Sequence, residues 1–494
     1  MRQDQRGSPA VLRSLCPRLD RTQGRDGVVL LSVATVTARQ WDAVVVGAGP
    51  VGSLLAGSLA GNGASVLVLE RDRSIPDQTR ASTLNSRSME IMSALGVPGL
   101  ADHPRSMFGH YGGIPVSLDK IDSPWAGLWV IPQPHLVHML REWAVDNGAV
   151  LKTGVTFTGA DALSSAVVAH TATSENYESK ILVGADGFDS AVRDALGFGL
   201  YRTTANRYMI RCDVKGISVA RRRFERHGDM VATAGMISPE ITRLMLHSPH
   251  YGPLATPTFE EVAKDWLEAT GEHVDGGECV WLDKFSNACT TAEKWKVGAA
   301  FLAGDAAHDQ PPVGGSSLNA GLQDVYNLVW KLTAVSGGAP EELAVTYGLE
   351  RAEATARMQE EVRDQEALIF GPERQQPDSL RDLLASSESF RQLIARTIAG
   401  LDTQYLTTET GPRISPTELT HELGRPLQPY EEAALGRRAI LVIGARADEV
   451  LLAIRPDGHT AGSSGNRRTG PDSAVTRWFE DFLNPVVLKA GTHV

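Results

Sequence analysis

The sequence predicts an α/β fold made of two or three domains. Its 494 residues exceed what one ordinary hydrophobic core supports. Near the N-terminus, an apolar run, a glycine-rich turn, a helix and a second apolar run follow one another, which is typical of a parallel sheet. Short alternating apolar runs between residues 200 and 300 indicate antiparallel strands, and a small α/β segment ends the chain.

A glycine motif lies between the first predicted strand and helix, in WDAVVVGAGPVGSLLAGSLAGNGASVLVLER (residues 41–71). Gly47 allows a tight turn, Gly49 lets a pyrophosphate approach the backbone, and Gly52 lets the helix pack on the strand. The helix N-terminus attracts phosphate through its unpaired N–H groups and its dipole. Glu70 ends the second strand, where a carboxylate accepts hydrogen bonds from ribose hydroxyls. The motif predicts a Rossmann-like unit that binds FAD or NAD and disfavours NADP in this slot.

Two later segments each place an acidic residue directly after an apolar strand. LVGADGFDSAVR (182–193) carries Asp186-Gly187, and FLAGDAAHDQPPVGGSSLNAGLQDVYNLVWKL (301–332) carries Gly304-Asp305. A proline–glycine loop follows the second of these, and a helix is expected to begin at about Leu318.

The remaining segments give a coarser prediction. One helix is expected near residues 259–270 among the antiparallel strands, and residues 341–400 are mostly helical. After Gly411 the stretch GPRISPTELTHELGRPLQPY is predicted to be a linker, and strands follow at 438–444 and 449–454. Side chains alternate in the middle strands, so half of a small apolar set should line a cavity over the cofactor and half should face outward. That set is Met230, Val231, Met236 and Met245.

The three motif segments, in this order, resemble the FAD-dependent aromatic hydroxylases of the p-hydroxybenzoate and phenol hydroxylase group. The resemblance covers about residues 41–400. The stretches RCDVKG…GDMVATAGMISPEITRLML and RPDGHTA also resemble the subgroup that oxidises aromatic polyketides such as angucyclines and anthracyclines. The resemblance implies a Rossmann-like FAD-binding domain, an inserted antiparallel-sheet substrate domain and a small thioredoxin-like C-terminal domain.

Domain boundaries follow from this combination. Residues 1–40 are expected to be a disordered N-terminal extension. The discontinuous FAD-binding domain is expected to comprise residues 41–114, 130–199 and 295–400. Residues 115–129 and 200–294 should form the substrate-binding middle domain, and residues 412–494 the thioredoxin-like domain. Because residues 430–494 contain no cysteine, this last domain is not expected to carry out redox chemistry.

The resemblance also implies roles for individual residues. Asp305 should accept hydrogen bonds from the ribityl chain, and Leu318 and Asn319 should open a helix that points at the flavin N1–C2=O edge. Such a helix N-terminus stabilises the negative charge of reduced flavin. The residues expected to bind FAD without a covalent link are Gly47, Gly49, Pro50, Gly52, Glu70, Arg71, Arg80, Gln133, Phe157, Asp186, Gly187, Gly304, Asp305, Leu318 and Asn319.

No residue is expected to act as a dedicated acid or base. The flavin-directed loop should be formed by Pro312, Gly314, Gly315 and Ser317. Ser317 stands where the family usually has glycine, which affects how oxygen is held near the flavin. His308 follows Asp305 closely, but the resemblance assigns it to the loop scaffold.

The implied function is an FAD- and NAD(P)H-dependent monooxygenase. It would hydroxylate an aromatic polyketide-type phenol or quinone through a flavin C4a-hydroperoxide. No second glycine fingerprint exists, so NAD(P)H should bind transiently, and the choice between NADH and NADPH stays open. Two alternatives remain, namely Baeyer–Villiger oxygenation of a polyketide ketone and a flavin-binding protein without oxygenase turnover.

Composition excludes several other classes. The net charge of −11 disfavours a nucleic-acid partner, and no apolar run is long enough to cross a bilayer. The four scattered cysteines form no C-x-x-C pair, which argues against a metal site and suits a reducing, cytoplasmic compartment. The expected partner is a small aromatic substrate, and the protein is expected to be a monomer or a homodimer.

Overall fold

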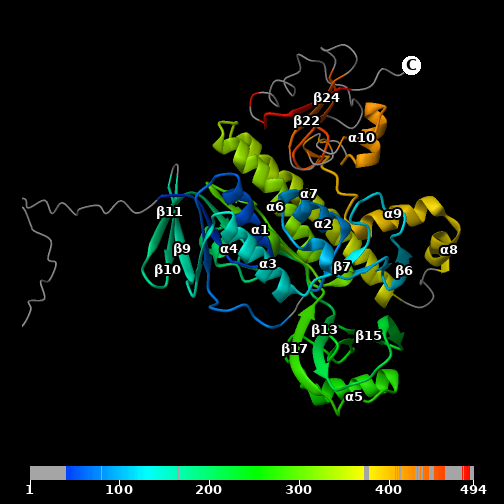
Figure 1. The fold of residues 1–494 in the computed structure, drawn as a ribbon. Coiled ribbons are helices and arrows are strands. Elements are labelled where there is room, and N and C mark those ends of the chain that lie inside the picture. The colour runs from blue at the N-terminus through cyan, green and yellow to red at the C-terminus, as the bar shows by residue number, and fades with distance from the viewer. Residues whose placement is uncertain are drawn as a thin grey trace, which may run out of the picture. The chain divides into compact units, whose positions relative to one another are not determined.

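The structure is a computed structural model. It describes residues 40–78, 81–163, 166–371, 378–406, 408, 410, 413–428, 431, 434–435, 438–443, 450–461, 481 and 483–489 (Figure 1). The predicted N-terminal extension therefore lies outside the described residues, except for Gln40.

A largely parallel sheet forms the centre of the part of the chain that is predicted to bind FAD. Its main path is β19-β20-β11-β1-β2-β8, and β10 and β9 extend it from β11. Val44 of β1 lies opposite Leu182 of β11 and Leu67 of β2, and all three side chains are fully buried. Burial on both faces explains why these strands are continuous apolar runs. The strands are β1 (Trp41–Val46), β2 (Val66–Glu70), β8 (Val150–Thr153), β9 (Phe157–Ala162), β10 (Val167–Thr171), β11 (Asn176–Gly184), β19 (Lys296–Val297) and β20 (Ala300–Leu302).

Helices pack on this sheet and complete the largest hydrophobic core. A Cβ atom at Gly57 would lie only 2.4 Å from the Trp143 ring, so glycine lets α1 approach α3 closely. Tyr347 of α7 reaches the sheet, where its hydroxyl donates a hydrogen bond to the Leu302 carbonyl at 2.7 Å. The helices are α1 (Pro50–Gly61), α2 (Ser86–Leu95), α3 (Gln133–Asp146), α4 (Ala191–Ala195), α6 (Ser316–Ser336) and α7 (Glu342–Phe370), with short 3-10 turns at Leu100–Asp102, Gly304–Ala306 and Val313–Gly315.

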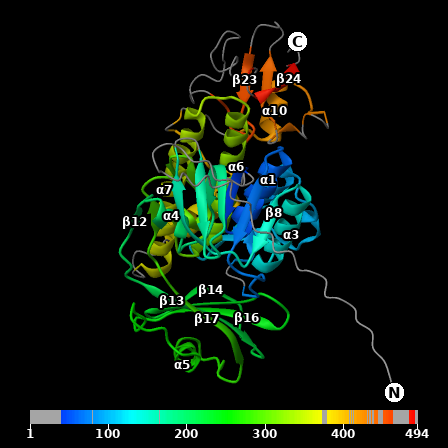
Figure 2. The ribbon, with the colours of Figure 1, turned by 90° about the vertical axis from the view of Figure 1, so that its left-hand side faces the viewer.

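A second, antiparallel sheet is built from residues 208–286 in the order β14-β15-β16-β13-β17 (Figure 2). Helix α5 covers one face of it, where Trp266 is fully buried among strand residues such as Ile210 and Leu244. Val231 instead packs with Val362 of α7 and so lies on the other face. The elements are β13 (Tyr208–Lys215), β14 (Arg222–His227), β15 (Met230–Met236), β16 (Ile241–His247), α5 (Phe259–Thr270) and β17 (Glu278–Ser286).

This arrangement decides which of the alternating side chains share a face. Met245 is paired across the sheet with Thr233, which has the same parity as Val231. Met230 and Met236 have the opposite parity, and Met236 is 71% exposed. The face directed at α7 therefore includes Val231 and Met245.

Residues 83–84 and 105–130 form two small sheets, β3-β7-β4 and β5-β6. Val116, Leu118 and Ile121 are buried in one cluster with residues of α8 and α9, such as Leu384 and Ile394. The assignment of residues 115–129 to the middle domain stays a prediction. The elements are β3 (Thr83–Leu84), β4 (Arg105–Ser106), β5 (Phe108–Tyr111), β6 (Ile114–Ser117), β7 (Leu128–Val130), α8 (Asp378–Ser386) and α9 (Glu388–Ala399). A further small sheet has the order β12-β18-β21 and joins β12 (Leu200–Arg202), β18 (Thr290–Ala292) and β21 (His308–Asp309).

The C-terminal part has its own apolar core around a sheet of order β23-β22-β24. The strands predicted at 438–444 and 449–454 correspond to β22 (Ile440–Ile443) and β23 (Val450–Ile454), and β24 spans Val486–Lys489. The thioredoxin-like assignment stays a prediction.

The predicted linker after Gly411 was wrong in one respect, because it contains helix α10 (Pro416–Leu423). Ser415 accepts a hydrogen bond from the Glu418 N–H, and the Glu418 side chain accepts one from the Ser415 N–H. This capping box, together with proline at the first helical position, outweighs the proline- and glycine-rich composition. In the described residues, no helix is long and apolar enough to cross a bilayer.

Candidate functional site

The glycine turn between β1 and α1 is shaped by two close backbone approaches. Gly47 has φ +97°, and a Cβ atom there would lie 2.3 Å from the Ala185 carbonyl oxygen. A Cβ atom at Gly52 would lie 2.0 Å from the Gly47 carbonyl oxygen. By contrast, nothing lies within 4 Å of a Cβ atom built on Gly49. The first and third glycines therefore allow packing, and the second leaves open space before the N-terminus of α1, which begins at Pro50.

Glu70 lies beside this turn at the end of β2 and is 8% exposed. Its Oε2 accepts a hydrogen bond from the Ala48 N–H at 2.7 Å, and its Oε1 accepts one from the Asp72 N–H at 2.9 Å. Arg141 of α3 donates from Nη2 to Glu70 at 3.3 Å and from Nε to the Ala48 carbonyl at 2.8 Å. Sequence reasoning missed Arg141, because only the packing of α3 brings it to the turn. Arg71, also predicted to bind FAD, is exposed.

The Asp186 carboxylate binds the start of α4. Its Oδ1 accepts a hydrogen bond from the Ser190 hydroxyl at 2.6 Å, and its Oδ2 accepts one from the Val192 N–H at 3.1 Å. Burial raises the pKa of Asp186, although these hydrogen bonds act to lower it. Arg193 then donates to the carbonyls of Phe188 at 2.9 Å and Ala306 at 3.3 Å, so it joins this loop to the loop of Asp305.

The Gly304-Asp305 turn is held from behind by Asp324 of α6. The Asp324 Oδ2 accepts hydrogen bonds from the Gly304 N–H at 2.9 Å and from His308 Nε2 at 2.8 Å, and its Oδ1 accepts one from Arg351 Nε at 2.7 Å. Charge attraction from His308 and Arg351 outweighs burial and lowers the pKa of Asp324. Asp305 is exposed between buried neighbours, so its carboxylate is accessible to a ligand.

His308 is fully buried, and its ring stacks on Trp295 with 5.6 Å between centroids. Its contact with the buried Asp324 favours the scaffold interpretation over a general-base role. Sequence reasoning singled out neither Asp324 nor Arg351, which lie in segments predicted only to be helical.

The loop that precedes α6 contains two consecutive glycines in the left-handed region, Gly314 with φ +74° and Gly315 with φ +68°. The helix begins at Ser316, two residues before the predicted start at Leu318, because Gly315 serves as its N-cap. No side chain caps this helix. In a regular helix with this N-cap, the N–H groups of Ser316, Ser317 and Leu318 have no intrahelical acceptor. An N–H group without an intrahelical acceptor can donate to an anionic ligand.

Asn319 holds this helix end against α2. Its Oδ1 accepts hydrogen bonds from the Asn85 N–H at 2.9 Å and the Ser88 hydroxyl at 2.6 Å. Its Nδ2 donates to the carbonyls of Gly315 at 2.7 Å and Thr83 at 3.3 Å. The buried side chain therefore makes four hydrogen bonds and fixes where α6 begins.

Ser317, the departure from the family pattern, has a partner in Gln310. The Gln310 Nε2 donates to the Ser317 hydroxyl at 2.9 Å, and Gln310 is 4% exposed. The Pro312 segment between them packs through Val313 into a cluster with Val231 of the second sheet. Sequence reasoning missed Gln310, which becomes visible only from its contact with Ser317.

Two further predicted FAD residues have other contacts. Gln133 opens α3, and it bonds the Ala81 backbone through its own N–H at 3.0 Å and through Oε1 at 3.2 Å. Phe157 is 5% exposed and lies in the main core. Arg80 lies outside the described residues. Gly187 has φ +83°, and a Cβ atom at this position would meet nothing within 4 Å.

These residues fit an FAD molecule. Open space at Gly49 before a helix N-terminus suits a pyrophosphate, buried Glu70 suits a ribose, and exposed Asp305 suits polyhydroxyl chemistry. The uncapped start of α6 suits the anionic edge of a reduced flavin. Among the residues that the structure describes, no group of histidine, cysteine and acidic side chains could hold a metal ion.

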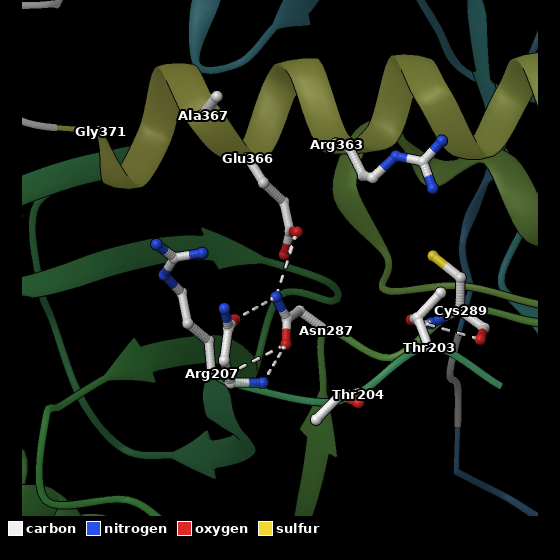
Figure 3. A pocket seen from close by; sticks show the side chains of 10 residues that line it. Thr203, Thr204, Arg207, Asn287, Cys289, Arg363, Glu366, Ala367 and Gly371 are labelled. Atoms are coloured by element: carbon white, nitrogen blue, oxygen red, sulfur yellow. Dashed lines mark hydrogen bonds between the residues drawn. The ribbon is translucent and has the colours of Figure 1, made fainter.

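A separate cavity of about 400 Å³ lies between α7 and the segments that link the two large sheets (Figure 3). Asn287 is fixed there by hydrogen bonds from the N–H groups of Asn206 and Arg207, both 3.0 Å long, and it donates to Glu366 at 3.3 Å. Burial raises the pKa of Glu366 and raises that of the Cys289 thiol to about 11, so this cysteine is not a ready thiolate.

Comparison with known proteins decides the family. The chain matches the FAD binding domain family over residues 40–362. It is 30% identical over 461 residues to the rifampicin monooxygenase of Streptomyces venezuelae, which is 85% of this chain and 94% of that protein. The chain belongs to the FAD-dependent aromatic monooxygenases. The predicted family, its cofactor FAD and its monooxygenase class are thereby confirmed.

Two further proteins are similar to this chain, one by its crystal structure and one by its sequence. The crystal structure of CabE, an aromatic hydroxylase from angucycline biosynthesis, matches with a TM-score of 0.76 and 27% identity, over 91% of this chain and 100% of that one. The dialkyldecalin synthase of Streptomyces rugosporus is 27% identical over 469 residues, which is 88% of this chain and 98% of that protein. The match to CabE confirms the mixed α/β fold, and the predicted domain boundaries stay predictions.

Proposed function

We propose that this FAD-dependent monooxygenase uses NAD(P)H and O2 to hydroxylate an aromatic polyketide-type phenol or quinone. The observation that carries the proposal is a pair of fixed elements. Asp324 holds the turn that carries the exposed Asp305, and Asn319 holds the start of α6, which has no side-chain cap. Bound FAD supplies the redox and oxygen-activating chemistry. The similarity to CabE, an aromatic hydroxylase from angucycline biosynthesis, supports an aromatic polyketide-type substrate.

The chain's own residues have three tasks in this reaction. The N–H groups at the start of α6 stabilise negative charge without reorganising, because the helix is fixed by Asn319. Val313 and Val231 pack the loop before α6 against the second sheet, which excludes water from that side. The substrate's own hydroxyl supplies the activation of its ring, so no dedicated protein base is required.

We propose that the substrate lies against the face of the second sheet that is directed at α7. Arg243 binds Asp213 there through two hydrogen bonds of 2.7 and 2.8 Å, and Arg211 binds Asp283 at 2.8 Å. Both guanidinium groups lie over the Trp281 ring, at 4.7 Å for Arg211 and 5.4 Å for Arg243. The two ion pairs neutralise the charges of the arginines and the aspartates. The guanidinium groups and the Trp281 ring together form a fixed, flat surface, which suits a planar polycyclic substrate.

The experiment that tests this function is anaerobic and aerobic turnover of the holoenzyme. We expect NAD(P)H consumption to accelerate when a polycyclic phenol or quinone is added, with one oxygen atom incorporated into the product. Ring hydroxylation and lactone formation both add one oxygen atom, so the product mass does not distinguish them. The product structure from fragmentation mass spectrometry and NMR does. Because the chain is also similar to a dialkyldecalin synthase, a product that contains no added oxygen is a third outcome of this experiment. Product formation without NAD(P)H consumption would contradict oxygenase turnover.

Asp305→Ala tests the FAD site itself. The variant should bind FAD about 10- to 100-fold more weakly, because hydrogen bonds to a charged group contribute about 1.5–3 kcal/mol. Quenching of FAD fluorescence on titration into the apoprotein measures the dissociation constant. Asp146→Ala, which removes an exposed carboxylate from the end of α3, is the control and should leave FAD binding unchanged. An unaltered dissociation constant in Asp305→Ala would exclude the ribityl role of this carboxylate.

A further inference from the structure

The cavity in Figure 3 lies where the chain passes between its two large sheets. Residues 203–207 lead from β12 into β13, and residues 287–289 lead from β17 into β18. Helix α7 covers both segments. Thr291 of β18 pairs with His308 of β21, which leads directly into the loop before α6. The cavity is thus one strand away from the flavin-directed loop.

Two arginines line this cavity without a close carboxylate partner. The Arg207 guanidinium lies over the Phe370 ring at 5.0 Å. Arg363 projects from α7 with its side chain 54% exposed, and its nearest carboxylate, on Glu360, is 3.9 Å away. In the described chain, neither guanidinium has a carboxylate within hydrogen-bonding distance. An arginine without a carboxylate partner is suited to bind phosphate, which arginine binds through charge-assisted and often bidentate hydrogen bonds.

A carboxyl group lies between the two arginines (Figure 3). Glu366 is 7% exposed and accepts one hydrogen bond of 3.3 Å, from Asn287. Asn287 is held by two backbone N–H groups, so it orients Glu366 into the cavity rather than neutralising its charge. A buried carboxyl oxygen is an acceptor for ribose hydroxyls, the same task that Glu70 has at the other site. The exposed Thr204 adds a hydroxyl group at the rim, whereas the Thr203 hydroxyl accepts a hydrogen bond from the Cys289 N–H at 2.8 Å.

We propose that this cavity binds the ADP-ribose part of NAD(P)H, with Arg207 and Arg363 on its phosphates and Glu366 on a ribose hydroxyl. The proposal rests on the proposed function, which requires this reductant. A volume of about 400 Å³ suits a nucleotide-sized part rather than a whole dinucleotide, which leaves the nicotinamide outside to reach the flavin. A cavity that is open to solvent and has no glycine-rich turn suits a ligand that binds and leaves in each turnover.

Anaerobic stopped-flow reduction of the holoenzyme by NADPH and by NADH tests the assignment. The double variant Arg207→Gln/Arg363→Gln should raise the dissociation constant for the reductant about ten-fold or more, because each lost guanidinium removes a charge-assisted hydrogen bond. The limiting rate of flavin reduction, the FAD content and the visible spectrum should match the wild type. Arg221→Gln removes an exposed positive charge just before β14 and is the matched control, which should behave as the wild type.

Calorimetric titration with ADP-ribose and 2′-phospho-ADP-ribose measures the site without electron transfer. Both should bind the wild-type holoenzyme and lose affinity in the double variant, and Glu366→Gln should weaken them less. Equal affinity in the wild type and the double variant, or an equal loss in Arg221→Gln, would overturn the assignment. A wild type that binds ADP-ribose but is reduced by neither cofactor would instead contradict the proposed function and leave the site standing.

Discussion

Arg455→Met is expected to lower the free energy of unfolding by about 3–5 kcal/mol, because it leaves the buried Asp457 carboxylate without its cation and leaves Lys331 as the remaining cation on Glu350. Arg455 of the C-terminal part binds Glu350 of α7 through two hydrogen bonds of 2.7 and 2.9 Å. It also binds Asp457, and all three residues are at most 7% exposed. Chemical denaturation of the holoenzyme measures the effect.

The same change should weaken FAD binding, because the turn at Asp457 contacts the helices that form the flavin site. The Asp457 side chain accepts a hydrogen bond from Trp330 of α6 at 3.1 Å, and its carbonyl accepts one from Arg87 of α2 at 2.8 Å. Glu350 is followed on α7 by Arg351, which holds Asp324. The polar contacts of the C-terminal turn and those of the Gly304-Asp305 turn therefore meet at two adjacent residues of α7, Glu350 and Arg351.

Lys180→Met is the matched control for burial. The Lys180–Asp42 pair has the same 2.7 Å distance as Arg455–Glu350, but its side chains are 64% and 37% exposed. Loss of such a surface pair should cost less than about 1 kcal/mol. Equal losses in the two variants would contradict the buried-network argument. Adding Glu350→Gln to Arg455→Met should give a smaller loss than the sum of the single variants, because both changes break the same Arg455–Glu350 ion pair. Lys331 tolerates the loss of Glu350, because burial lowers its pKa to about 7.

Leu318→Pro is expected to retain most FAD while lowering the flavin reduction potential. Proline deletes the N–H of the third residue of α6, a position that has no intrahelical acceptor, so the helix itself survives. Losing one donor in a preorganised site costs on the order of 2.7–4 kcal/mol. Equilibration with reference dyes measures the potential, and anaerobic mixing with NAD(P)H measures the slower reduction.

Leu318→Ala controls for the side chain, because it keeps the N–H and should have the wild-type potential. FAD content must be measured alongside, since proline also restricts Ser317 before it. A Leu318→Pro variant that keeps its FAD and the wild-type potential would exclude the helix start as the stabiliser of reduced flavin.

The sequence by itself determined the local parts of this protein. The order of strand, glycine turn, helix and acidic strand end was readable because Gly47 and Gly52 are required by short-range sterics, and because buried parallel strands need unbroken apolar runs. The family followed from three such segments, and the match over residues 40–362 confirmed it. The missed helix α10 was also readable, since its capping box is a local signal.

Only the tertiary structure decided which polar side chains meet. Asp324 binds Gly304, His308 and Arg351, and nothing in its helical spacing separates it from an ordinary core-facing carboxylate. The partnership of Arg455 with Glu350 joins segments 105 residues apart. Buried charges must find partners wherever packing places them, and that placement depends on contacts distant in sequence. For the same reason the cavity at Arg207, Glu366 and Asn287 could not be predicted, because three segments build it and none of them carries a motif.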